Sequence, residues 1–110
     1  MNEIIAIIGD YRHPERFEEA AKKISITGAS VYNLTIYNHL PVGEAQENRN
    51  IDIEIANRVF VLRDWKNSLD ARINLTHAMR FVEKRVYYEE MGEYEKLIGD
   101  LQKPCACFPG

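Results

Sequence analysis

The sequence predicts an α/β domain in which a parallel sheet of four or five strands lies between two layers of helices. Short apolar or β-branched runs alternate with longer segments of helical periodicity, so that strand and helix follow each other four times. The first run, EIIAIIG, is almost entirely apolar, as in a strand that is buried on both faces of a parallel sheet. Such alternation favours a flavodoxin-like or Rossmann-like three-layer sandwich with right-handed crossovers.

The first half of the chain predicts two strands, each followed by a helix. A strand over residues 3–9 ends at a glycine. Next, DYRHPERFEEAAKKI predicts a helix that stops near Gly28, with Pro14 in its first turn and an apolar stripe of Phe17, Ala20, Ala21 and Ile24. The segment 30–38, SVYNLTIYN, predicts a second strand because it is rich in β-branched and aromatic side chains. A helix over 45–57 follows, in which Ile51 and Ile55 share one face.

The second half repeats this alternation. RVFVL, residues 58–62, predicts the third strand, and RVYYE, residues 85–89, predicts the fourth. Between them, a helix is expected over about 69–83, with a stripe of Ala71, Leu75, Ala78 and Val82. A last helix over 93–102 carries an apolar stripe of Tyr94, Leu97, Ile98 and Leu101.

Length and composition bound the function. The chain of 110 residues is 45% apolar and 28% charged, as in one ordinary globular domain, which we place at residues 1–103. Its net charge is −3 and it has no basic run, so a nucleic-acid polymer is a poor candidate partner. No apolar run approaches the roughly 20 residues that span a bilayer, and the N-terminal run lacks the basic flank of a signal peptide. We therefore expect a cytoplasmic protein without a membrane partner.

The two cysteines lie in a segment rich in proline, KPCACFPG, and we expect residues 104–110 to form a flexible tail. Cys105 and Cys107 could contribute to a metal site, but zinc needs about four ligands and no other residues have partner spacing. The sequence therefore predicts no metal and no cofactor, and two free thiols in a reducing compartment.

In a parallel α/β fold, ligands collect beyond the carboxyl ends of the strands, where the strand order reverses. Neither a G-x-G-x-x-G fingerprint nor a P-loop is present, which argues against dinucleotide chemistry and NTP hydrolysis. Gly9 ends the first strand and allows close approach of a ligand or of a neighbouring backbone. After it, Asp10, Tyr11, Arg12 and His13 offer a carboxylate, a stacking ring and two anion binders, although a polar turn before a helix has the same composition.

The end of the third strand is the second candidate region. WKNSLDAR brings together Trp65, Asn67, Ser68 and Asp70. Ser68 suits the N-cap of the next helix and Asp70 suits its first turn, so both have a structural explanation. The same free N–H groups also bind anions or sugar hydroxyls. Trp65 would either cover a flat ligand or pack half-buried on the core.

Two histidines outside these turns, His39 and His77, have no serine or cysteine at a recognisable triad position. A hydrogen-bonded structural histidine is the commoner case for both.

The segment RNIDIEIANRVFVLRDWKNSLDARINLTHAM resembles small proteins, many of them encoded by phages, that are related to nucleoside 2-deoxyribosyltransferases. The likeness covers roughly residues 3–90 and depends on a strand that ends in GW and continues into an NS-x-GA-x-x-E helix start. The corresponding residues here are Trp65, Asn67, Ser68, Ala71 and, in the last place, Asn74, and Asp70 stands where the motif has its glycine. The resemblance implies a flavodoxin-like fold, a nucleoside or nucleotide ligand, and a homodimer or larger assembly.

The resemblance also implies chemistry, from which this chain departs. The related enzymes use a helix glutamate as nucleophile on the anomeric carbon and an acid to protonate the leaving base. Here Asn74 occupies the position of the glutamate, and an uncharged amide is a poor nucleophile. Asp70 or Asp10 could replace it as acid or base. Asp52, in the R-x-ID pattern that the family carries, could bind a sugar hydroxyl or remain a solvated helix charge.

The sequence thus predicts nucleoside or nucleotide binding, and two functions remain open. One is an enzyme that hydrolyses or transfers at an N-glycosidic bond, with Asp10 or Asp70 as the catalytic group. The ligand would contact Gly9, Tyr11, Asp52, Trp65, Asn67, Ser68 and Asn74. The other is a non-catalytic module that sequesters a nucleotide. A protein-binding or purely structural role is a third expectation.

Overall fold

Four parallel strands form a single sheet in the order β2-β1-β3-β4 in the computed structural model, which describes residues 3–81 and 85–102. The strands are β1 (Ile4–Ile8), β2 (Ser30–Asn33), β3 (Arg58–Val61) and β4 (Arg85–Tyr88). The helices are α1 (Pro14–Ser25), α2 (Val42–Ile55), α3 (Leu69–Met79) and α4 (Tyr94–Gln102). The predicted α/β fold with a parallel sheet is therefore confirmed.

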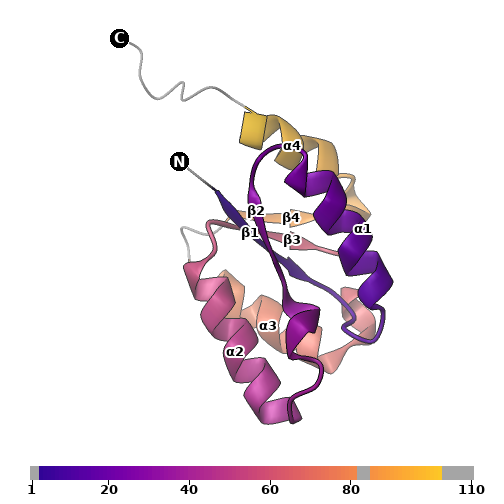
Figure 1. Cartoon of the computed structure of the whole chain (residues 1–110), viewed down its shortest axis with the longest axis vertical. Coiled ribbons are helices and arrows are strands. Elements are labelled where there is room, and N and C mark those ends of the chain that lie inside the picture. Colours follow the sequence, from indigo (N-terminus) through magenta and orange to yellow (C-terminus); the bar gives the residue numbers. More distant parts are fainter. Residues whose placement is uncertain (1–2, 82–84, 103–110) are drawn as a thin grey trace.

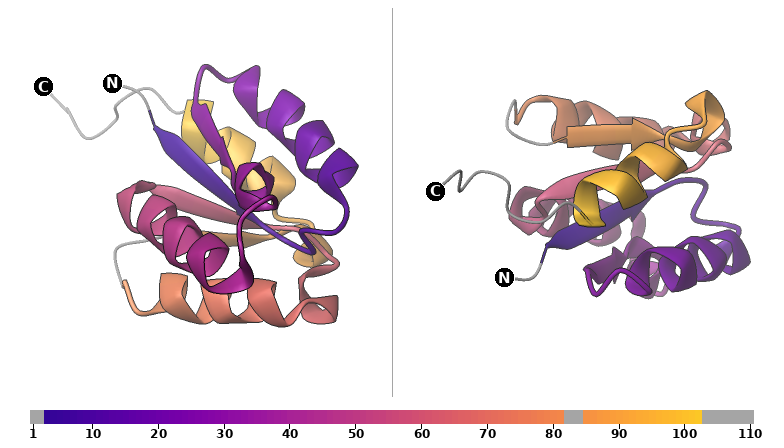
Figure 2. Two further views of the ribbon diagram at one scale, coloured as in Figure 1. Left: turned by 60° about the horizontal axis from the view of Figure 1, so that its bottom comes forward. Right: turned by 90° about the horizontal axis from the view of Figure 1, so that it is seen from above.

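The helices form one layer on each face of the sheet. In Figures 1 and 2, α1 and α4 lie on one face, whereas α2 and α3 lie side by side on the other. The chain moves outward from β1 to β2, crosses back to β3, and then continues to β4. The strand order therefore reverses between β1 and β3, and the turns after these two strands mark the switch point of the fold.

The two central strands form the core, as their apolar sequences predict. Ile5 to Ile8 of β1 are fully buried, and Val59, Phe60 and Val61 of β3 are at most 1% exposed. The predicted stripes of two helices also reach the core, through Phe17, Ala20 and Ile24 of α1 and through Ala71, Leu75 and Ala78 of α3. Of the last stripe, Leu97 is fully buried and its neighbours are partly buried.

The second strand is shorter than predicted, because its chain turns into a 3-10 helix, η1 (Leu34–Tyr37). The side chain of Asn33 causes the change, since its Oδ1 accepts hydrogen bonds from the backbone N of Thr35 at 3.1 Å and from its hydroxyl at 2.7 Å. β-branched composition alone predicted a strand to residue 38, and it missed this local cap.

Helix α2 begins at Val42, three residues before the predicted start at 45, and ends at Ile55. Ile51 and Ile55 do share a face, but that face is exposed. The buried side of the helix consists instead of Ala45, Arg49 and Ile53. The buried side could not be recognised from the pattern of apolar residues, because one of its members is an arginine.

The remaining differences lie at element ends. Helix α3 ends at Met79, earlier than the expected 83, and Val82 lies outside the described residues. The expected flexible tail, 104–110 with Cys105 and Cys107, lies outside them as well. Over residues 3–81 and 85–102, no helix is long and apolar enough to cross a membrane, and no three metal-binding side chains are grouped as a metal site.

Candidate functional site

The turns after β1 and β3 are in direct contact at the carboxyl edge of the sheet. The backbone N of Asp10 donates to Oδ1 of Asp64 at 3.1 Å, and the guanidinium of Arg12 donates to the backbone oxygen of Asn67 at 3.1 Å. Gly9 permits this approach, because a Cβ at that position would lie 2.9 Å from the side chain of Leu62. The glycine therefore serves close packing between the two turns, which are hydrogen-bonded to each other.

Two buried aspartates in these turns each hold an arginine. Asp10 is 1% exposed and accepts from Nε of Arg12 at 2.9 Å and from a terminal nitrogen at 2.7 Å. Asp64 is 5% exposed and accepts from Arg16 at 2.8 Å. The hydrogen bonds from Arg12 hold the pKa of Asp10 below its ordinary value, although burial acts in the opposite direction. Asp10 is therefore a carboxylate whose two oxygens are already bonded.

Tyr11 and Asn74 lie in the interior and join the first loop to both helices of the far face. The Tyr11 hydroxyl donates to Oδ1 of Asn74 at 2.9 Å, and the Asn74 amide donates to Asn50 at 2.8 Å. Arg49 places its guanidinium carbon 3.8 Å from the centre of the Tyr11 ring. Burial raises the pKa of Tyr11. Asn74 is fully buried, so its amide makes structural contacts and is closed to solvent.

The residues after β3 have structural partners. Ser68 caps α3, because its Oγ accepts from the backbone N of Ala71 at 3.1 Å. Asp70 accepts from the side chain of Gln46 at 3.0 Å. Trp65 begins a short 3-10 helix, η2 (Trp65–Asn67), and its half-buried indole donates to Glu90 at 3.2 Å beside the ring of Tyr88. The indole thus leans toward β4, away from β1.

Asp52 and the two histidines lie apart from these turns. Asp52 accepts from the Tyr37 hydroxyl at 2.7 Å, and this bond is the main cause that raises the pKa of Tyr37 to about 12. His77 contacts Glu54 at 2.8 Å between α2 and α3, and His39 is exposed in a loop. The structure therefore brings the turns of Asp10 and Asn67 together and leaves Asp52 on a separate patch.

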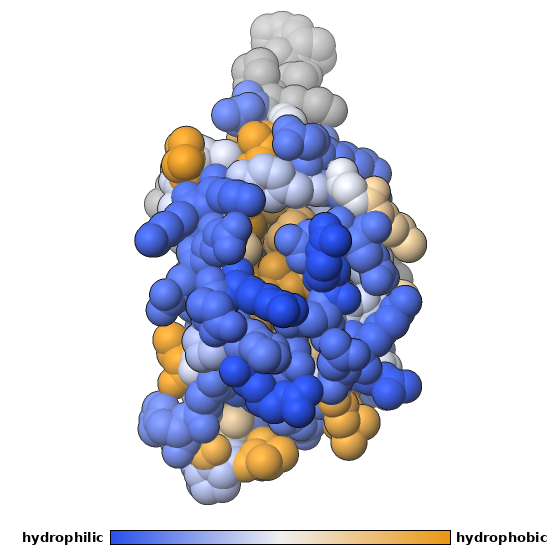
Figure 3. Space-filling view, turned by 90° about the vertical axis from the view of Figure 1, so that its right-hand side faces the viewer, coloured by the Kyte–Doolittle hydropathy of each residue, from blue (hydrophilic) through white to orange (hydrophobic). Residues whose placement is uncertain are grey.

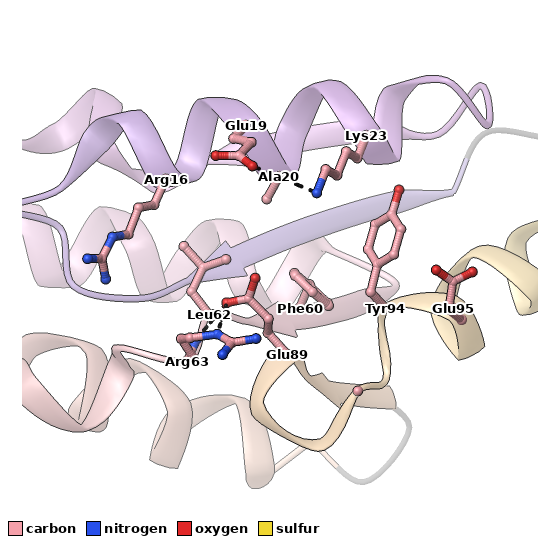
Figure 4. A pocket seen from close by; sticks show the side chains of 11 residues that line it. Arg16, Glu19, Ala20, Lys23, Phe60, Leu62, Arg63, Glu89, Tyr94 and Glu95 are labelled. Atoms are coloured by element: carbon pink, nitrogen blue, oxygen red, sulfur yellow. Dashed lines mark hydrogen bonds and ion pairs between the residues drawn. The ribbon is translucent and has the colours of Figure 1, made fainter.

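A cavity of about 500 Å³ lies beside the switch point, between α1 and α4. It arises because α1 packs against the edge strand β2 and α4 packs against the edge strand β4, which leaves part of β3 between them without a helix. Figure 3 shows a hollow with an apolar floor and a hydrophilic rim on this side, and Figure 4 shows the side chains around the cavity. It is lined by Arg16, Glu19, Ala20, Lys23, Phe60, Leu62, Arg63, Glu89, Gly92, Tyr94 and Glu95.

The floor of this α1–α4 cavity is apolar and its rim is charged. Phe60 and Leu62 lie at its base with only 1% and 2% of each exposed, so a ligand would reach their edges. Tyr94 offers more of its ring, packed edge-on against Phe60 at 6.0 Å. The rim cations Arg16, Lys23 and Arg63 have side chains that are 51%, 57% and 69% exposed.

Two of the three rim cations, Lys23 and Arg63, are paired loosely. Lys23 lies 3.8 Å from Glu19, and Nε of Arg63 lies 3.5 Å from Glu89, as the dashed lines in Figure 4 show. Solvent-exposed pairs of this length contribute little stability, roughly 0–1 kcal/mol each. Lys23 and Arg63 can therefore turn toward an anionic ligand at small cost, whereas Arg16 is held by the buried Asp64 at 2.8 Å.

None of the catalytic or binding residues predicted from the sequence lines this cavity. The cavity reaches the turn after β3 through Leu62 and Arg63, and Arg16 on its rim binds Asp64 of the same turn. The signal that the sequence offered was the location, since the carboxyl edge beside the switch point is where ligands of such sheets collect. The residues that line the cavity could not be predicted from the sequence, because they depend on how α1 and α4 pack on the sheet.

Compared with protein-family models, with curated proteins and with solved structures, the chain has no significant match. The resemblance to nucleoside 2-deoxyribosyltransferases therefore stays a prediction from the residues quoted above.

Proposed function

We propose that this protein binds a nucleoside phosphate in the α1–α4 cavity and holds it without breaking its glycosidic bond. One observation carries the proposal: a cavity of about 500 Å³ at the carboxyl side of β3 combines an apolar floor with three exposed cations. Its volume falls in the range of roughly 300–1,000 Å³ in which proteins bind small molecules.

The lining suits the three parts of a nucleotide. Tyr94 offers a flat ring for a base once Lys23, whose Nζ lies 5.7 Å from the ring centre, turns away toward the phosphate. Lys23 and Arg63 offer charge-assisted hydrogen bonds for a phosphate group, and Arg16, bonded to Asp64, adds positive charge at the rim. The carboxylates of Glu19 and Glu89 can accept from sugar hydroxyls or an exocyclic amine, because carboxylates are acceptors only.

The absence of catalysis in the proposal has its own support. Asn74 stands where the resemblance expects the nucleophilic glutamate, and it is buried between Tyr11 and Asn50. Asp10 would have to release Arg12 before either oxygen could act as a base or nucleophile. Asp70 is already an acceptor for Gln46.

Calorimetric titration with a panel of nucleosides and their mono- and diphosphates tests the binding. We expect at least one phosphorylated member to bind more tightly than its parent nucleoside. Lys23→Ala should weaken that member about tenfold, which is close to the value of one hydrogen bond between charged groups, and should leave the nucleoside unaffected. Lys22→Ala, which removes the neighbouring charge outside the cavity, is the matched control.

Two results would overturn this function. One is that no member of the panel binds at millimolar concentration. The other is that Lys22→Ala and Lys23→Ala weaken binding equally, which would reveal a diffuse charge effect instead of a site. The single tryptophan shows where the ligand binds. A ligand covered by Trp65 would change the tryptophan fluorescence. A ligand in the α1–α4 cavity should instead bind the Trp65→Phe variant with wild-type affinity, because Trp65 does not line that cavity.

The enzymatic alternative has a separate test. Bound nucleosides and nucleotides can be incubated with the protein and assayed for free base by chromatography. We expect no free base from the wild type, and none from Asn74→Glu. Release of base that Asp10→Ala or Asp70→Ala abolishes would replace the sequestering function with N-glycosidic chemistry.

A further inference from the structure

A second groove lies on the outer side of helix α3, across the sheet from the α1–α4 cavity. In the left view of Figure 2, α3 lies at the lower border of the molecule. The groove has a volume of about 490 Å³. It is lined by Asn50 of α2, by Leu69, Arg72, Ile73, Thr76 and His77 of α3, and by Arg80, the C-cap of α3. We call it the α3 groove, and it contains none of the site residues predicted from the sequence.

The lining residues of α3 share one side of the helix because of their spacing. Leu69, Arg72, Ile73, Thr76 and Arg80 follow each other at intervals of one, three or four residues, which keeps them within one stripe of an α-helix. The buried residues of α3 lie on the other side. From Leu69 to Arg80 the stripe extends for about 16 Å at 1.5 Å per residue.

The α3 groove is shallow and partly apolar. The side chains at its base are themselves exposed, Leu69 by 69% and Ile73 by 38%. Sites for small molecules usually bury most of the ligand, roughly 70–90% of its surface. A small molecule on Leu69 and Ile73 would remain largely in water, whereas an elongated segment could cover both. The shape of the groove therefore favours a peptide segment as its occupant.

The two arginines of the α3 groove differ from the others in the chain. Six arginines have a side-chain hydrogen bond or ion pair, namely Arg12, Arg16, Arg49, Arg58, Arg63 and Arg85. Within residues 3–81 and 85–102, the exposed guanidinium groups of Arg72 and Arg80 have neither. Because the net charge of the chain is −3, acids are in excess, and the shortage of acidic partners is local to this groove.

The other polar groups of the α3 groove are donors or already have a partner. The side-chain oxygen of Asn50 accepts from Asn74 at 2.8 Å, which leaves the Asn50 amide nitrogen as a donor. The Thr76 hydroxyl donates to the backbone oxygen of Arg72 at 2.9 Å, and His77 contacts Glu54 at 2.8 Å. An occupant thus meets guanidinium and amide N–H groups, which carboxylates can accept.

We propose that the α3 groove binds a short acidic segment of another protein in helical form. The apolar side of such a helix packs on Leu69 and Ile73, and one carboxylate reaches each arginine. Arg72 and Arg80 are eight residues apart, about 12 Å along the axis, so the two acids of the partner helix also lie about seven or eight residues apart. Arginine suits this role because its planar guanidinium binds a carboxylate through two parallel N–H groups.

Charge on the neighbouring helix favours a narrow partner over a wide anionic surface. Helix α2 exposes Glu47 and Glu54 beside the groove, and Glu54 is the residue that contacts His77. A lipid bilayer with anionic headgroups would meet these carboxylates together with the arginines. A single helix that lies on α3 avoids them.

The size of the groove predicts weak, reversible binding. A footprint about 16 Å long and about 10 Å wide, the diameter of one helix, is far below the roughly 800 Å² per partner of a stable complex. We expect a dissociation constant on the order of 100 μM.

Fluorescence polarisation of labelled synthetic peptides, titrated with the full chain, tests the proposal. The probe is a peptide of about 15 residues of alanine, leucine and glutamate, which is long enough to form a helix. Its leucines lie on one side, flanked by two glutamates about eight residues apart. One control peptide has glutamine in place of both glutamates, and another has the same composition in scrambled order. We expect both control peptides to bind at least tenfold more weakly than the probe.

Variants of the chain locate the binding. Arg72→Glu and Arg80→Glu should each weaken the probe at least tenfold, because each places like charges together. Lys22→Glu makes the same change of charge at an exposed position of α1 and should bind like the wild type. Ile73→Ser should also weaken the probe, whereas Ile26→Ser, at the exposed end of α1, should not. Unchanged circular dichroism spectra show that the variants are folded.

Three results would overturn the proposal. One is that the probe does not bind at millimolar concentration. Another is that the glutamine peptide binds as tightly as the probe. The third is that Lys22→Glu weakens the probe as much as Arg72→Glu does, which would indicate a diffuse effect of charge.

Two other occupants of the α3 groove have their own measurements, each of which would replace the acidic helix. Sedimentation of the chain alone would reveal a second copy, if Arg72→Glu and Ile73→Ser abolish its self-association. Co-sedimentation with vesicles of phosphatidylcholine and phosphatidylserine would reveal a membrane surface, if the same variants abolish it. None of these measurements includes a nucleotide, so binding in the α1–α4 cavity is tested independently.

Discussion

The two faces of the sheet use polar residues in opposite ways. On the face of α1 and α4, charged side chains stand at the rim of a cavity, and the ion pairs of Lys23 and Arg63 are loose and exposed. On the face of α2 and α3, polar side chains lie between the helices and bond them to each other, whereas apolar side chains point outward. Polar side chains that can change partners are suited to binding a ligand. Polar side chains that are held in fixed hydrogen bonds are suited to keeping two helices together.

The difference has a geometric cause. Helices α2 and α3 both pack against the central strand β1 and against each other, so their adjoining sides are buried. Helices α1 and α4 pack on the edge strands β2 and β4, so the space above β3 is not filled. The same four-stranded sheet therefore supports a closed pair of helices on one side and a separated pair on the other, as the two views in Figure 2 show.

The largest effect that this comparison predicts is on Asn74. Asn74→Ala should lower the free energy of unfolding by about 2–4 kcal/mol, because it leaves the buried hydroxyl of Tyr11 and the side chain of Asn50 without a partner and opens a small cavity. Urea denaturation measures the change.

The counterpart on the other face should be nearly neutral. Lys23→Ala removes only a loose surface pair and is expected to change stability by less than about 0.5 kcal/mol. A loss of comparable size for Lys23→Ala and Asn74→Ala would show that the polar residues of the two faces do not differ as we describe.

The contact between the turns after β1 and β3 should be the next most sensitive to substitution, as measured by the free energy of unfolding. Gly9→Ala places a Cβ 2.9 Å from Leu62, and the backbone or the leucine must shift, at a cost of about 1–3 kcal/mol. Gly43→Ala in α2 meets nothing within 4 Å and should stabilise by up to about 1 kcal/mol, as alanine does in helices. Equal responses to urea from both variants would contradict a packed seam at Gly9.

Much of the architecture could be predicted because burial leaves a plain signal in the sequence. A strand buried on both faces, such as Ile4–Ile8, must be apolar throughout, and a helix with one buried side shows a stripe. The errors fell where local chemistry overrides this signal. Asn33 caps η1 and ends β2 early, and Arg49 occupies a buried position that composition assigns to apolar residues.

The location of the candidate site could be predicted from the sequence, but the residues that form it could not. That the turns of Gly9 and Trp65 would be neighbours follows from parallel strands, whose carboxyl ends share one edge. The sequence could not show that Arg12 bonds Asp10 and that Arg16 bonds Asp64, because the order of residues in the chain does not reveal which side chains are in contact. The cavity rim of Lys23 and Arg63 depends on helix placement, for which the sequence holds no local signal. The functional roles assigned to Asp10, Asp70 and the binding residues stay predictions.

The closed turn also predicts a modest dependence of stability on acid. Arg12 lowers the pKa of Asp10 in the folded protein below the value of about 3.9 expected in the unfolded chain. The folded state therefore keeps this carboxylate ionised to lower pH than the unfolded state does. Its contribution to stability is complete above the unfolded pKa and is lost as the pH falls through the folded pKa.

Removing either Asp10 or Arg12 should make the free energy of unfolding depend less on pH in the acid range. In Asp10→Asn and in Arg12→Ala, urea denaturation between about pH 5 and pH 2 should show a smaller loss of stability than in the wild type. The effect should be small, because Arg12 is 72% exposed and solvent screens its charge. An unchanged slope in both variants would mean that Asp10 and Arg12 are not paired in solution, and that the mouth between the two turns is open to a ligand.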